Sequence, residues 1–141
     1  MLAESFMQGL LIGLVVGTVF VVIGLTIAFR RKGTIAGVGT GKRPQTFEAA
    51  VSPEEAIARI LDEAPGWGYA VDDADETRKV ILLSSKPSLV SWGFFFPVVL
   101  SPKEPGKTSV QVGVKSKVFQ YGPIVWAAQR KCVDRIRSAL A

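Results

Sequence analysis

The chain has 141 residues, of which 48% are hydrophobic, and its 17 Lys and Arg against 12 Asp and Glu give a formal charge of +5. It has no histidine and one cysteine, which excludes Ser-His and Cys-His catalytic pairs, the usual zinc ligand and an internal disulfide. Residues 47–141 hold twelve basic and eleven acidic side chains, so the charge excess lies outside them and does not indicate a nucleic-acid-binding surface.

Residues 6–29 form a run of 24 residues without a charged side chain. As a helix rising ~1.5 Å per residue, the run is ~36 Å long, enough to cross a hydrocarbon layer of ~30 Å with some tilt. It lacks the basic start, the short apolar run and the small-residue cleavage site of a cleaved signal peptide. We therefore predict a transmembrane helix that serves as a signal-anchor, preceded by a short extracytoplasmic tail of residues 1–5.

Small residues recur along one side of this predicted span. At ~100° per residue they fall within a sector ~100° wide, with bulky residues such as Val15 and Val22 opposite. Such a stripe lets two helix backbones approach closely in lipid, although glycine is also common in membrane spans generally. We predict a glycine zipper that packs against a helix of the same chain or of another subunit, formed by Gly9, Gly13, Gly17, Gly24 and Ala28.

Basic residues follow the span, whereas Glu4 precedes it. The positive-inside rule then places the carboxyl-terminal portion in the cytoplasm of a single-pass plasma-membrane protein. We assign a role in topology and in attraction to anionic lipid headgroups to Arg30, Arg31, Lys32, Lys42 and Arg43.

Residues 30–46 are predicted to be a basic, glycine-rich juxtamembrane linker. From residue 33 onward they contain four glycines, one proline and no apolar period, which predicts a flexible coil with a reach on the order of 20 Å. They do not match a phosphate-binding loop, because Ala36 stands where that motif needs glycine and Arg43 where it needs Ser or Thr.

The remaining residues, 47–141, are predicted to form one small domain. Ser52, Pro53 and Glu55 are typical of a capped helix start, and Pro65-Gly66 ends that helix. An antiparallel meander of four strands is expected next, over residues 67–73, 79–85, 89–102 and 108–117.

Three of these strands carry a further prediction. Residues 79–85 are apolar on both sides, which indicates a strand buried on both faces. Pro97 cannot donate a ladder hydrogen bond, so its strand is expected at a sheet edge or with a bulge there. The last strand alternates clearly, with Val110, Val112 and Val114 predicted to face inward.

A final amphipathic helix is predicted from Gly122-Pro123 to the end of the chain. Its apolar stripe predicts that the Cys132 thiol is buried and unreactive. Both helices should pack on one face of the sheet, which makes the fold an α+β, αββββα domain. This order resembles that of small membrane-tethered αββββα domains and, in part, half a helix-grip fold. The stripe consists of Ile124, Ala128, Cys132, Ile136 and Leu140.

Four acidic residues crowd the turn after the first strand: Asp72, Asp73, Asp75 and Glu76. A calcium loop would need glycine where Arg78 stands, so a solvated acidic hairpin turn is the expected structure.

These observations favour a non-catalytic accessory or assembly protein of a membrane complex, whose partners are the lipid bilayer and a transmembrane helix. We predict no enzyme activity, cofactor, metal or nucleic acid. The alternative is a membrane-tethered binding module for an apolar or lipid-like ligand, although the same side chains suit an ordinary core. Its contact residues would be Trp67, Tyr69, Trp92, Phe94, Phe95 and Phe96.

Overall fold

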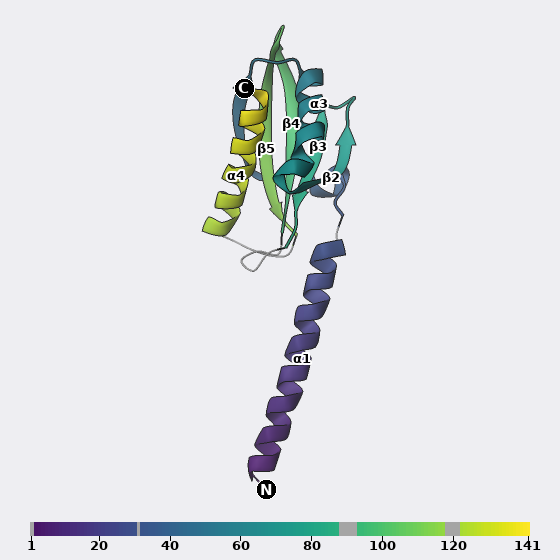
Figure 1. The fold of residues 1–141 in the computed structure, drawn as a ribbon, viewed down its shortest axis with the longest axis vertical. Helices are drawn as coiled ribbons and strands as arrows, with labels where there is room; N and C mark the ends of the chain where they lie inside the picture. Colours follow the sequence, from purple (N-terminus) through teal and green to yellow (C-terminus); the bar gives the residue numbers. More distant parts are fainter. Residues whose placement is uncertain (1, 31, 88–92, 118–121) are drawn as a thin grey trace.

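The computed structural model describes residues 2–30, 32–87, 93–117 and 122–141. A long helix, α1 (Leu2–Arg30), projects from a layered domain (Figure 1). The domain contains α2 (Ile35–Val38), β1 (Lys42–Ala49), α3 (Pro53–Glu63), a 3-10 turn η1 (Ala64–Trp67), β2 (Tyr69–Asp75), β3 (Val80–Ser85), β4 (Phe94–Glu104), β5 (Lys107–Ser116) and α4 (Pro123–Leu140).

The sheet is antiparallel, with strand order β1-β5-β4-β3-β2. Strands β2 to β5 are the predicted meander. The prediction of four strands was wrong, because β1 adds a fifth from residues assigned largely to the linker. Its sequence, KRPQTFEA, hides the strand because an edge position leaves most of its side chains exposed. Pro44 is tolerated there because the register shifts between Lys42 and Gln45.

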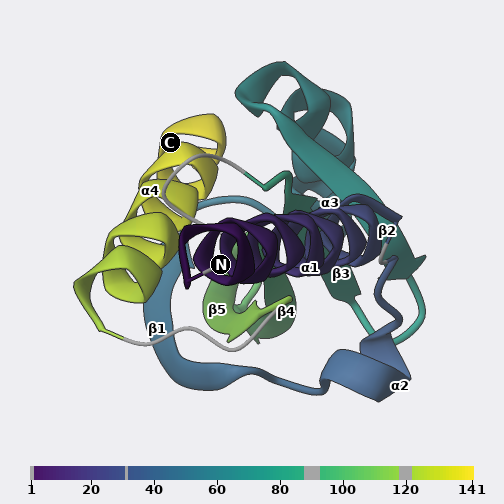
Figure 2. The same ribbon diagram turned by 90° about the horizontal axis from the view of Figure 1, so that it is seen from below.

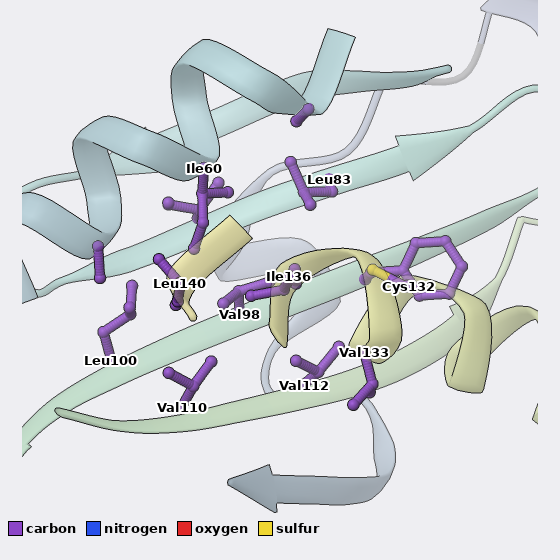
Figure 3. Close-up of a cluster of buried hydrophobic side chains, with 14 of the residues drawn as sticks. Ile60, Leu83, Val98, Leu100, Val110, Val112, Cys132, Val133, Ile136 and Leu140 are labelled. Carbon is purple, nitrogen blue, oxygen red and sulfur yellow. The ribbon is translucent and has the colours of Figure 1, made fainter. Parts of the chain in front are cut away.

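Helices α3 and α4 cover the same face of the sheet, as predicted (Figures 1 and 2). Between the helices and the sheet lies a cluster of fully buried aliphatic side chains (Figure 3). The predicted inward side of β5 is confirmed by its three buried valines. The cluster includes Ile60, Leu83, Val98, Leu100, Val110, Val112, Val114, Val133, Ile136 and Leu140.

The start of α3 follows the sequence prediction. The Ser52 hydroxyl accepts a hydrogen bond from the Glu55 amide at 3.3 Å, and Pro53 occupies the first turn. This N-cap satisfies one of the amides that a helix start leaves without a partner.

Pro97 corrects another prediction, because β4 is a central strand. The ladder continues on both sides of this residue, and its register to β3 does not shift. A Cβ atom added to Gly113 of β5 would lie 3.2 Å from Pro97 Cγ. The proline ring therefore packs where β5 carries no side chain, and this space lets a proline enter the middle of the sheet.

Candidate functional site

The face of the sheet opposite α3 and α4 is covered by residues 33–41, which we call the strap. In Figure 2 the strap passes below the sheet while the two helices lie above it. It begins beside β2 and ends where β1 pairs with β5, so it crosses from one edge of the sheet toward the other. The segment predicted to be a flexible spacer is thus a packed layer of the domain.

Two glycines let the strap approach the sheet closely. A Cβ atom at Gly33 would lie 2.7 Å from Phe95 Cε1 and 2.8 Å from Leu82 Cδ2. A Cβ atom at Gly113 would lie 2.1 Å from the Thr40 carbonyl oxygen. Only residues without a side chain fit at these distances. The strap therefore buries Phe95 and Leu82, which are 1% and 0% exposed.

Two carboxylates of β2 hold the start of the strap. Asp72 Oδ2 accepts a hydrogen bond from the Gly33 amide at 2.9 Å, and its Oδ1 accepts from the Ser84 hydroxyl at 2.8 Å. Asp73 Oδ2 accepts from the Ile35 amide at 2.9 Å. Hydrogen bonds to a charged acceptor contribute roughly 1.5–3 kcal/mol each. The prediction of a solvated acidic turn was wrong for these two residues, which lie within β2 and bind the backbone of the strap.

A break in the regular pairing of β2 accompanies these contacts. The register of β2 against β3 shifts between Val71 and Asp73. Asp75 caps the following turn by accepting from the Arg78 amide at 3.0 Å. Among the residues that the structure describes, no group of three or more His, Cys, Asp and Glu side chains could hold a metal ion.

The strap leaves little free chain between α1 and the domain. Helix α1 ends at Arg30, and Gly33 is already hydrogen-bonded to β2. Three residue steps span at most about 11 Å. The end of α1 therefore lies next to the domain, in place of the longer separation that a flexible linker allows.

Helix α1 itself is long and apolar enough to span a membrane. Its residues 2–26 reach a mean hydropathy of 2.5 over the most apolar window, and none of that window is buried. A Cβ atom added to Gly9, Gly13 or Gly17 would meet no atom within 4 Å. The predicted stripe is thus open along this part of the helix. Gly24 is half-buried, and the side chain of Ala28 lies outside the described part.

The predicted headgroup-binding residues are divided between two places. Lys32 follows α1 and is exposed. Lys42 and Arg43 lie in β1, where Arg43 Cζ is 4.8 Å from the centre of the Trp126 ring. Arg31 and the side chain of Arg30 lie outside the described residues.

The predicted aromatic contact residues lie on both faces of the sheet. Trp67 and Tyr69 meet edge to face with ring centres 6.5 Å apart, and Tyr69 lies 5.5 Å from Phe96. Phe94 and Phe96 are also neighbours, at 6.1 Å, and both are buried in the core under the helices. Phe95 points to the other face, under the strap. Trp92 lies outside the described part of the chain.

Cys132 is fully buried in the core beside Tyr69. Burial raises the pKa of the Cys132 thiol well above its ordinary value. Burial also raises the pKa of the Tyr69 hydroxyl. A thiol held protonated is a poor nucleophile. This agrees with the prediction of a buried structural cysteine.

Helix α4 begins differently from the prediction. Cys132, Ile136 and Leu140 of its apolar stripe are buried, but Ile124 is 44% exposed and Trp126 43% exposed. Gln129 is buried and donates from Nε2 to the carbonyl oxygens of Arg43 (2.6 Å) and Val112 (3.1 Å). Sequence reasoning missed this contact. The available signal was the uncharged run of residues 123–129, which is longer than one buried stripe requires.

No family model and no curated protein sequence matches the chain. Solved structures with some likeness include Ara h 8.0201, with 13% identity over 70% of this chain and 95% of that one, at a TM-score of 0.48. A START superfamily protein from Mycobacterium smegmatis has 16% identity over 70% of this chain and 92% of that one, at a TM-score of 0.40. A DUF4468 family protein from Bacteroides ovatus has 13% identity over 68% of this chain and 79% of that one, at a TM-score of 0.31. All three TM-scores are below 0.5.

Proposed function

We propose that the chain is a single-pass, membrane-anchored, non-catalytic accessory or assembly protein of a membrane complex. In this proposal α1 spans the plasma membrane, the domain lies in the cytoplasm, and the small-residue stripe of α1 packs against a helix of the same chain or of another subunit. The observation that carries it is the open stripe on an unburied apolar helix. In lipid, a stripe of this kind favours close helix packing.

The packing of the domain supports a non-catalytic role. The aromatic rings of Tyr69, Phe94 and Phe96 contact each other in the core, and the Cys132 thiol is enclosed. The alternative function, binding of an apolar or lipid-like ligand by these rings, has less support because the rings already pack against protein. It stays an untested prediction.

The test compares two substitutions on opposite sides of α1. Gly13→Ile places a branched side chain in the stripe and should reduce chemical crosslinking of α1 to its partner helix in native membranes. Val15→Ile enlarges the bulky side by one methylene and should leave the crosslinking unchanged. If the two variants crosslink to the same extent, helix association through the stripe is refuted.

A further inference from the structure

Apolar exposure in the domain is concentrated at the start of α4. Outside α1, Ile124 and Trp126 are the large hydrophobic side chains that the structure shows as exposed among its described residues. They belong to the uncharged run Pro-Ile-Val-Trp-Ala-Ala at residues 123–128, where Ala127 is exposed as well. Val125 and Ala128 of this run pack against the core, so core packing does not account for the two large exposed side chains, Ile124 and Trp126.

Basic side chains accompany this exposed surface. The Arg43 guanidinium stacks over the Trp126 ring at 4.8 Å, and Lys42 beside it is exposed. The Gln129 side chain holds the Arg43 carbonyl oxygen at 2.6 Å, which fixes β1 against α4 at this point. We call Lys42, Arg43, Ile124 and Trp126 the Trp126 patch. The Arg43-stacked ring of Trp126 and the side chain of Ile124 lie about 200° apart around the first turn of α4, so they flank the start of this helix, with Lys42 next to Arg43 in the sequence.

The Trp126 patch lies at the end of the domain from which α1 projects. Figure 1 shows α4 starting at this end and running away from α1 to the carboxyl terminus. The opposite end carries the hairpins of β2–β3 and β4–β5, whose tips expose charged residues such as Arg78 and Glu104. The short connection keeps Gly33, at the β2 edge of the sheet, within about 11 Å of the end of α1, and the Trp126 patch lies toward the opposite, β1 edge at the same end of the domain.

We propose that the Trp126 patch docks onto the headgroup region of the bilayer that α1 spans. This inference rests on the proposed function, because it needs α1 to be in a membrane. Tryptophan favours the interface, where its ring is partly buried and its N–H stays hydrated. Arg43 and Lys42 face anionic headgroups, which attract basic residues close to the surface. The partner of the patch is therefore a lipid surface containing anionic lipid.

Two labelling positions on α4 test the docking. Ala127→Cys places a thiol beside the patch without changing its members, and Ser138→Cys places one on the same side of the helix, 11 residues or about 16 Å further along its axis. The buried Cys132 does not compete for the label. Each full-length variant carries an environment-sensitive nitrobenzoxadiazole dye. It is reconstituted into vesicles of phosphatidylcholine and phosphatidylglycerol that contain a headgroup spin label.

The emission at position 127 should shift to the blue and be quenched, whereas the emission at 138 should do neither. Adding Trp126→Ser and Ile124→Ser should abolish the effect at 127. Flotation after alkaline extraction is measured on the same samples. If the chain floats with the vesicles but the dye at 127 is not quenched, or is quenched as much as the dye at 138, the docking of the patch is refuted. The proposal that α1 anchors the chain in the membrane then still stands. A chain that does not float overturns the proposed function and the docking with it.

Discussion

Substitution of Gly113 by alanine tests whether the strap is a packed layer of the domain. Gly113 lies in β5, where alanine would ordinarily be an improvement. Glycine inside a regular element loses more backbone entropy on folding, and replacing it at a compatible site stabilises a protein by about 0.4–1 kcal/mol. Without the strap, the substitution should therefore stabilise the domain slightly.

With the strap in place, we expect Gly113→Ala to destabilise the domain instead of stabilising it. The new Cβ atom would lie 2.1 Å from the Thr40 carbonyl oxygen and 3.2 Å from Pro97 Cγ. The nearer neighbour is backbone, which cannot rotate away like the tip of a side chain, so the strap itself has to move. Overpacking of this kind costs about 1–3 kcal/mol. After subtracting the gain from replacing a glycine, we expect the free energy of unfolding to fall by about 1–2 kcal/mol.

The assay is urea unfolding of the full-length chain in detergent, followed by tryptophan fluorescence. Hydrogen exchange provides a second readout, since displacement of the strap should release the amides of Gly33 and Ile35 from Asp72 and Asp73. Gly66→Ala is the matched control, because a Cβ atom there meets nothing within 4 Å. If Gly113→Ala is as stable as the wild type, with unchanged exchange at these two amides, the packed strap is wrong.

Three further predictions concern the limits of the domain, its thiol and its orientation. The chain 33–141 should be monomeric without lipid, whereas the chain 46–141 should aggregate in sedimentation, because it exposes Phe95 and Leu82 and removes part of β1 from the edge of β5. The Cys132 thiol should react with disulfide reagents only after unfolding. Its ordinary pKa is 9.0 and burial raises it, so this contribution to stability is complete below about pH 9. Between about pH 9 and pH 10 the free energy of unfolding should then fall, with a slope approaching about 1.4 kcal/mol per pH unit that Cys132→Ala should remove, whereas the loss that Tyr69 adds above its ordinary pKa of 10.0 should remain in the variant. Protease added to intact cells should leave residues 47–141 uncut, and cleavage there would contradict a cytoplasmic domain.

The elements that the sequence predicted correctly have local signals. The N-cap at Ser52 and the alternation of Val110, Val112 and Val114 can be recognised within a few residues, and each corresponds to an observed element. The buried stripe of α4 is likewise visible as a period of 3.6. Its first residue, Ile124, departs from this pattern, because it is 44% exposed whereas Cys132 and Ile136 are buried.

The strap and β1 have no such signal, because their order comes from tertiary contacts. The strap is held by carboxylates almost 40 residues away in the sequence and by glycine-sized gaps against Phe95 and Leu82. Glycine is read as flexible when seen alone, but Gly33 is required for close approach. The sequence did contain one indirect indication that a further segment covers the sheet. The strand at residues 79–85 was predicted to be buried on both faces, while both helices were placed on the same face. Some other segment had to cover the second face.

The short connection between α1 and the strap explains how a surface as small as the Trp126 patch can hold the domain on a bilayer. Full burial of a large apolar side chain contributes only about 1.5–3 kcal/mol, and Ile124 and Trp126 are already more than half buried. A free domain would bind a bilayer weakly through two such residues. Within one chain, the short connection from α1 makes the contact intramolecular, where the effective concentration reaches roughly millimolar or more. The strap also fixes the domain to that connection at β2 and, through β1, beside α4. Since the short connection already limits how far the domain can move from α1, docking costs less translational freedom than for a free domain, and a weak patch is sufficient to set how the domain stands on the membrane.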